Sequence, residues 1–141
     1  MRILAIDYGD ARTGVAVSDP TGLLAGFTTV IQSHNPDFGA SEVARLVKEH
    51  QAEELVMGFP RNMDGTEGPR AELYKSFAKK LEDTANMPVR LWDERRTTVE
   101  AHAILSENGK KMKKHRKNVD AVAATLILEG YLTYRRTHPQ G

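Results

Sequence analysis

The first third of the chain alternates short apolar runs with turn residues. One unbroken run, ILAI, covers positions 3–6, and a second, VAV, covers positions 15–17. Apolar runs without polar alternation are typical of strands that are covered on both faces. Gly9 and the sequence DPTG at positions 19–22 favour turns, and the β-branched residues at 28–31 favour a strand. We therefore predict an antiparallel meander of three strands, over residues 2–7, 14–18 and 27–31.

Helical and strand patterns alternate along the rest of the chain. Apolar stripes predict one helix that carries Val43 and Leu46 and another over positions 71–81. Buried-strand patterns fall at 54–58 and 88–92, and capping residues Thr97 and Asn118 begin two further helices. We predict a single α/β domain over residues 1–141, with a mixed five-stranded sheet and helices on both faces.

Acidic residues stand at the ends of predicted elements. Asp7 ends the first strand, Asp93 and Glu94 follow the fifth, and Asp120 lies in the first turn of the final helix. If the first and fifth strands emerge on the same edge, these carboxylates converge, and they repel one another unless a cation binds. Oxygen ligands without softer donors select Mg²⁺ or Mn²⁺, and two such ions can promote phosphodiester cleavage.

Each acidic position also has a simpler explanation. Asp7 begins an Asp-x-Gly sequence that is common in turns, and the helix dipole favours an acid at Asp120. Glu94 has arginines beside it with which it could pair at the surface. Because side chains alternate along a strand, Asp93 and Glu94 point to opposite faces, and only one joins Asp7 without a bulge. The residues alone leave open which one does.

Composition excludes several kinds of functional site and indicates where the protein is located. The chain has no cysteine, which excludes disulfides and thiolate zinc sites, and its five histidines lack the spacing of a metal-binding pair. Hydrophobic residues make up 40% and charged residues 28%, as in soluble proteins, and no apolar run approaches the roughly 20 residues of a membrane span. Nothing at the N-terminus resembles a signal peptide. We expect a cytoplasmic protein with no membrane partner.

Positive charge is concentrated in one short stretch, which we call the basic segment. The net charge is only +1, yet six of the eight residues at 110–117 are lysine or arginine, which leaves the remainder acidic. Such a segment is typical of a local surface for binding anions, and nucleic acid is the obvious polyanion. A solvated loop with no partner would show the same composition.

Four segments, taken in order, resemble one known family. They are DYGDARTGVA at 7–16, GFPRNMDGTE at 58–67, DER at 93–95 with TT at 97–98, and KNVDAVAA at 117–124. The family is YqgF/RuvX, whose members are regarded as pre-16S rRNA nucleases and are also called Holliday junction resolvase-like. The resemblance implies a ribonuclease H-like fold and a bacterial cytoplasmic nuclease that needs a divalent metal, Mg²⁺ or Mn²⁺. It ties the activity to maturation of the 5′ end of 16S rRNA.

The resemblance also assigns residues. Asp7, Glu94 and Asp120 become the catalytic and metal-binding carboxylates, which favours Glu94 over Asp93. The expected contacts to nucleic acid are Arg12, Arg61, Arg95, Lys110, Lys111, Lys113, Lys114, Arg116 and Lys117. Arg61 and Arg96 stand where the family usually has apolar residues, so both add positive charge beside the expected site.

Other functions compete with this interpretation. A Holliday junction or single-stranded DNA is the alternative substrate, and a non-catalytic nucleic-acid-binding protein is the next hypothesis. ATPases of the actin and sugar-kinase type also begin with Asp-x-Gly and a hairpin, but they close nucleotide between two lobes, and 141 residues suffice for one. The sequence is compatible with a monomer or a homodimer.

Overall fold

The computed structural model describes residues 2–21, 25–59, 68–93 and 119–137, with side chains from residue 122 onward in the last range. One five-stranded sheet has the order β3-β2-β1-β4-β5. Its strands are β1 (Ile3–Asp7), β2 (Arg12–Ser18), β3 (Ala25–Gln32), β4 (Glu54–Phe59) and β5 (Val89–Asp93). The first three strands are antiparallel neighbours, whereas β4 and β5 run parallel to β1. The predicted mixed five-stranded sheet is therefore confirmed.

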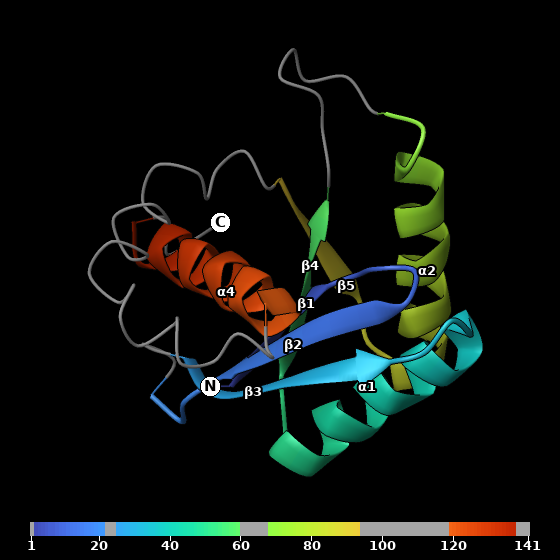
Figure 1. Cartoon of the computed structure of the whole chain (residues 1–141). Coiled ribbons are helices and arrows are strands. Elements are labelled where there is room, and N and C mark those ends of the chain that lie inside the picture. Colours follow the sequence, from blue (N-terminus) through green and yellow to red (C-terminus); the bar gives the residue numbers. More distant parts are fainter. Residues whose placement is uncertain (1, 22–24, 60–67, 94–118, 138–141) are drawn as a thin grey trace.

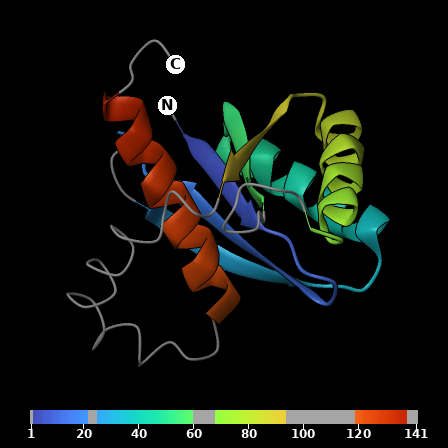
Figure 2. The same ribbon diagram turned by 90° about the horizontal axis from the view of Figure 1, so that it is seen from above.

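Helices cover both faces of this sheet. On one face lie α1 (Pro36–His50) and α2 (Ala71–Ala85), and on the other lies α4 (Val119–Thr137), as Figures 1 and 2 show. The core is accordingly divided in two by the alternation of side chains along the strands. In β1, Leu4 and Ile6 pack with α1 and α2, whereas Ile3 and Ala5 pack with α4.

Local sequence accounts for where the helices begin and end. The side chain of Asn35 caps α1, because its oxygen accepts hydrogen bonds from the backbone N–H groups of Asp37 and Phe38 at 2.9 and 3.4 Å. Gln51 and Asn86, which follow α1 and α2, adopt left-handed conformations with φ of 56°. The apolar stripe predicted for the second helix, including Phe77 and Leu81, is the buried face of α2.

All five strands differ from the sequence prediction by one or two residues at one or both ends. β3 begins at Ala25 rather than residue 27, because Ala25 pairs with Ser18 beyond an irregularity in the register. β4 extends to Phe59, which pairs with Asp93. The predicted helix that begins at Thr97 lies outside the described residues, and the single domain over residues 1–141 stays a prediction. Within the described ranges, no helix is both long and apolar enough to cross a membrane.

The turn between β1 and β2 requires a glycine. A Cβ added to Gly9 would lie 2.3 Å from the backbone oxygen of Arg12, whereas one added to Gly39, inside α1, would lie 3.7 Å from the ring of Phe77. We expect Gly9→Ala to lower the free energy of unfolding by about 1–3 kcal/mol through this overlap. The control Gly39→Ala should raise it by about 0.5–1 kcal/mol, because alanine favours helix. Urea unfolding measures both, and a Gly9→Ala variant as stable as the parent would contradict the turn geometry.

Candidate functional site

The carboxyl ends of three parallel strands meet at one edge of the sheet. Ile6 of β1 pairs with Met57 of β4, and Phe59 of β4 pairs with Asp93 of β5. Asp7 and Asp93 therefore end their strands at the same edge, with β4 between them. The expectation that the first and fifth strands emerge together is confirmed. Both aspartates are half-buried.

The two aspartates belong to opposite faces of the sheet. Asp7 follows Ile3 and Ala5 at intervals of two, so its side chain belongs to the face that α4 covers. Trp92 lies on that same face, with its ring centroid 5.7 Å from that of Tyr131 and 5.5 Å from that of Tyr134 in α4. Its neighbour Asp93 is thereby assigned to the face of α1 and α2. Asp93 is therefore poorly placed to share a ligand with Asp7.

Helix α4 crosses one face of the sheet, with its C-terminal part beside the start of β4. Near its C-terminal end, the Tyr131 hydroxyl donates a hydrogen bond to Oε1 of Glu54 at 2.8 Å, and Arg135 forms an ion pair with the same carboxylate. Glu54 is the first residue of β4 and pairs with Ile3 at the start of β1. The C-terminal end of α4 is therefore at the amino edge of these strands, and its first turn points toward their carboxyl edge (Figure 2).

The first turn of α4 belongs to the same face of the sheet as Asp7. Asp120 precedes Tyr131 by eleven residues, which is about 16 Å along a helix at 1.5 Å per residue. The first turn is therefore far from the end of α4 that contacts Glu54. Asp7 and the backbone of Asp120 lie on the same side of the sheet.

The remaining predicted site residues fall largely outside the described ranges. These are Glu94, Arg61, Arg95 and the whole basic segment. Arg12, the first residue of β2, is exposed at the β1–β2 turn that follows Asp7. No three described histidine, aspartate or glutamate side chains gather as a metal site. Of the four acidic positions considered, only Asp7 and Asp93 have described side chains, so the proposed trio stays a prediction.

Sequence reasoning missed the contact between the end of α4 and the start of β4. The hydroxyl of Tyr131 reaches Glu54, 77 residues away in sequence. No local pattern signals a pair at that separation. Two aromatic residues near the ends of β4 and β5, Phe59 and Trp92, are core residues, 2% and 5% exposed.

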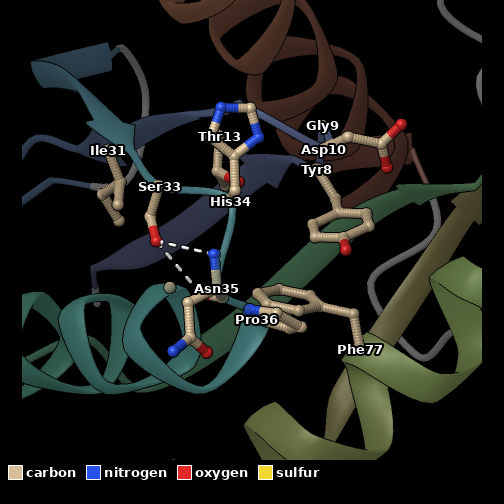
Figure 3. Close-up of a pocket in the computed structure, with 11 residues that line it drawn as sticks. Tyr8, Gly9, Asp10, Thr13, Ile31, Ser33, His34, Asn35, Pro36 and Phe77 are labelled. Carbon is tan, nitrogen blue, oxygen red and sulfur yellow. Dashed lines mark hydrogen bonds between the residues drawn. The ribbon is translucent and has the colours of Figure 1, made fainter.

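A separate hollow lies between the β1–β2 turn and the N-terminal end of α1 (Figure 3). Tyr8, Thr13, His34 and Phe77 are among its lining residues, and the ring of Tyr8 stacks on Phe77 with centroids 4.2 Å apart. Its volume of about 10 Å³ has room for roughly one water molecule. This hollow borders α1 and α2, so it is distinct from the face where Asp7 and α4 meet.

Comparison with known proteins decides the family. The model of the family described as "RuvX: Holliday junction resolvase" matches residues 1–134. The chain belongs to the RuvX family. Relatives in Bacillus subtilis (strain 168) and Halothermothrix orenii, each described as "Putative pre-16S rRNA nuclease", are 46% and 43% identical to it. The two matches cover 94% and 96% of this chain, and 97% and 96% of the relatives.

Solved structures agree on the fold of this RuvX protein. Thermus thermophilus RuvC, determined in complex with a Holliday junction substrate, superposes with a TM-score of 0.73 at 13% identity, over 98% of this chain and 96% of that one. The expected ribonuclease H-like fold is confirmed. A ROK hexokinase from Thermus thermophilus reaches 0.50 at 19% identity over 72% of this chain, but only 38% of the kinase is matched. The similarity to sugar kinases is thus limited to part of a larger protein. This agrees with the expectation that 141 residues suffice for one lobe and not for two.

Because of the contact between Tyr131 and Glu54, we expect the free energy of unfolding to decrease at alkaline pH. Burial, and then the hydrogen bond to Glu54, raise the pKa of Tyr131 to about 12. Because an unfolded tyrosine ionises near pH 10, this stabilisation is fully present below about pH 10 and is lost as the pH rises toward 12. In this RuvX protein we expect the free energy of unfolding to fall across that window, and to fall less steeply in Tyr131→Phe. Urea unfolding at a series of pH values tests this, and equal slopes would refute it.

Proposed function

We propose that this RuvX protein is a divalent-metal-dependent nuclease of the cytoplasm that hydrolyses phosphodiester bonds in the precursor of 16S rRNA. The observation that carries the proposal is the placement of Asp7 at the carboxyl edge of β1, on the face that the first turn of α4 approaches. The names of relatives at 43–46% identity support the substrate. The active centre is then the place where the carboxyl ends of the parallel strands meet α4.

Asp7, Glu94 and Asp120 are the proposed ligands. Glu94 is preferred over Asp93 because a second carboxylate that follows β5 and joins Asp7 must belong to the face of Trp92. Asp93 belongs to the opposite face. The donors are all carboxylate oxygens, and the chain has no cysteine, so the set suits Mg²⁺ or Mn²⁺. A divalent cation held there supplies Lewis-acid stabilisation of the scissile phosphate and lowers the pKa of the attacking water.

Each side chain has a task that follows from its position. Asp7 brings negative charge to a half-buried strand end above a packed apolar layer that contains Ala5 and Trp92. Arg12 stands exposed at the neighbouring turn, where it can bind a phosphate of the substrate. Arg61, Arg95 and the basic segment are proposed to hold the flanking strand by charge.

A four-way DNA junction or single-stranded DNA is the second candidate substrate. The description of the family as a Holliday junction resolvase favours it, whereas the likeness to RuvC at 13% identity supports the fold alone. A protein that only binds nucleic acid is disfavoured, because clustered carboxylates repel phosphate and weaken binding. Cleavage of a 16S rRNA precursor, a single strand of DNA and a four-way junction, measured side by side with and without Mn²⁺, ranks the substrates.

The carboxylate assignment predicts unequal effects of neighbouring substitutions. Asp7→Asn and Glu94→Gln should each abolish Mn²⁺-dependent cleavage while leaving nucleic-acid binding unchanged or tighter, because a repulsive charge is removed. The matched control Asp93→Asn, one residue from Glu94, should retain cleavage. Rates under single-turnover conditions and binding of labelled RNA provide the two readouts. Unimpaired cleavage by Asp7→Asn would overturn the metal mechanism, and loss in Asp93→Asn alone would exchange the two assignments on β5.

The basic segment predicts a salt effect. Replacing Lys113, Lys114 and Lys117 with alanine should weaken RNA binding, and each lost phosphate contact should flatten the slope of log affinity against log salt by about 0.7 for a single strand. Titrations at several KCl concentrations measure that slope. Alanine at Lys48, Lys79 and Lys80, on α1 and α2, provides a control with the same loss of three positive charges. An unaltered slope in the triple variant would show that the segment does not contact the nucleic acid.

A further inference from the structure

The two edges of the sheet are protected very differently. The β5 edge is a strand of five residues that contains Arg90 and Asp93 and is preceded by Pro88. Charges, proline and short length are the devices by which proteins prevent unwanted pairing at a sheet edge. The opposite edge is β3, which has eight residues, AGFTTVIQ, and contains neither charge nor proline. The β3 edge is thus longer than the β5 edge and lacks its protective features. This difference indicates that β3 can pair with a further strand.

The outer side of β3 offers backbone hydrogen-bonding groups. Among the strands that the structure describes, only β2 pairs with β3, as Figure 1 shows. Alternate residues of an edge strand direct their N–H and C=O groups away from the sheet. Gly26, Phe27 and Thr28 are exposed along this side. An extended segment that lies against β3 would find these groups ready to pair.

A groove runs between β3 and α1 beside this edge. It has a volume of about 280 Å³ and is lined by Phe27, Thr29, Phe38 and Leu46 among others. Phe27 and Phe38 are 39% and 50% exposed, which is high for such large apolar side chains. The ring of Phe27 lies 4.4 Å from that of His50 at the end of α1, so the helix runs back along the strand. The groove therefore provides apolar surface parallel to an edge at which β2 is the sole described neighbour.

The rim of the groove is acidic. Its charged lining residues are Glu42, Arg45 and Glu49, and Arg45 pairs with both glutamates, at 3.0 and 2.6 Å. One cation against two anions leaves a net charge of −1. A second copy of the chain that paired through β3 about a two-fold axis would bring two such rims together. This charge disfavours self-association and favours a cationic occupant.

We propose that β3 and the groove beside α1 bind an extended cationic peptide segment of another protein, which adds to the sheet as a sixth strand. Backbone hydrogen bonds to β3 provide the affinity, and alternate apolar side chains of the peptide enter the groove near Phe27 and Phe38. Its lysine or arginine side chains meet the rim of Glu42 and Glu49. The groove lies on the α1 face of the sheet, whereas Asp7 belongs to the α4 face, so this proposal does not depend on the proposed nuclease activity.

The probe for this surface is a fluorescent peptide of alternating lysine and valine. Its anisotropy is followed with the full chain, freed of nucleic acid, alongside a glutamate–valine peptide and a lysine–valine peptide that is N-methylated at alternate backbone nitrogens. We expect the lysine–valine peptide to bind, and each comparison peptide to bind at least about tenfold more weakly. For the N-methylated peptide, this factor corresponds to the loss of one or two net hydrogen bonds. Equal binding of the N-methylated peptide would overturn the proposed strand addition.

Substitutions locate the binding. Thr29→Lys places a cation in the groove and should weaken binding about tenfold, whereas the control Leu73→Lys, on exposed α2 surface, should not. The double variant Glu42→Gln with Glu49→Gln alters only the rim and should abolish the preference for lysine over glutamate peptides. Unchanged binding in both groove variants would refute the site. A concentration-dependent dimer in sedimentation that Thr29→Lys abolishes would assign the edge to a second copy instead.

Discussion

The arrangement of the candidate site depends above all on how α4 docks against the sheet. Its apolar side chains pack on Ile3, Ala5 and Val56, which are the side chains that β1 and β4 present on that face. At the far end, Glu54 receives the hydroxyl of Tyr131 and the guanidinium of Arg135. The apolar contacts hold the helix to the face, and the polar contacts hold its C-terminal part at the start of β4. Together they place the first turn of α4 on the face to which Asp7 belongs.

Much of the fold could be predicted because its signals are local. The run at positions 3–6, the stripe of α2 and the turn at Gly9 each describe an element by themselves, and every predicted strand is present. The choice between Asp93 and Glu94 could not be made from the residues. It depends on Trp92 facing α4, a contact between segments about forty residues apart in sequence. The resemblance to the family favours Glu94, and the structure assigns Asp93 to the face opposite Asp7, so Glu94 stays the proposed ligand.

The sheet separates two kinds of surface. At the carboxyl ends of β1 and β5 stand Asp7 and Asp93, and the nuclease that we propose has its active centre on the α4 side of this edge. The β3 edge is uncharged, exposed and bordered by an acidic groove, a combination that suits an extended cationic chain. The same five strands thus support both the proposed site for nucleic acid and the proposed surface for peptide. β3 and β4 lie on opposite sides of β1 and β2. The proposed nucleic-acid site and the proposed peptide surface could therefore be occupied at the same time.

Anomalous diffraction from a crystal soaked in Mn²⁺ tests the central claim most directly. The account predicts manganese at the carboxyl edge of β1, coordinated by oxygens of Asp7, Glu94 and Asp120 at about 2.1–2.2 Å, near the distance typical of such ions. It also predicts that the carboxylate of Asp93 stays on the other face, away from the ion. Manganese bound by Asp93 without Asp7, or no manganese at this edge at concentrations that support cleavage, would contradict the account.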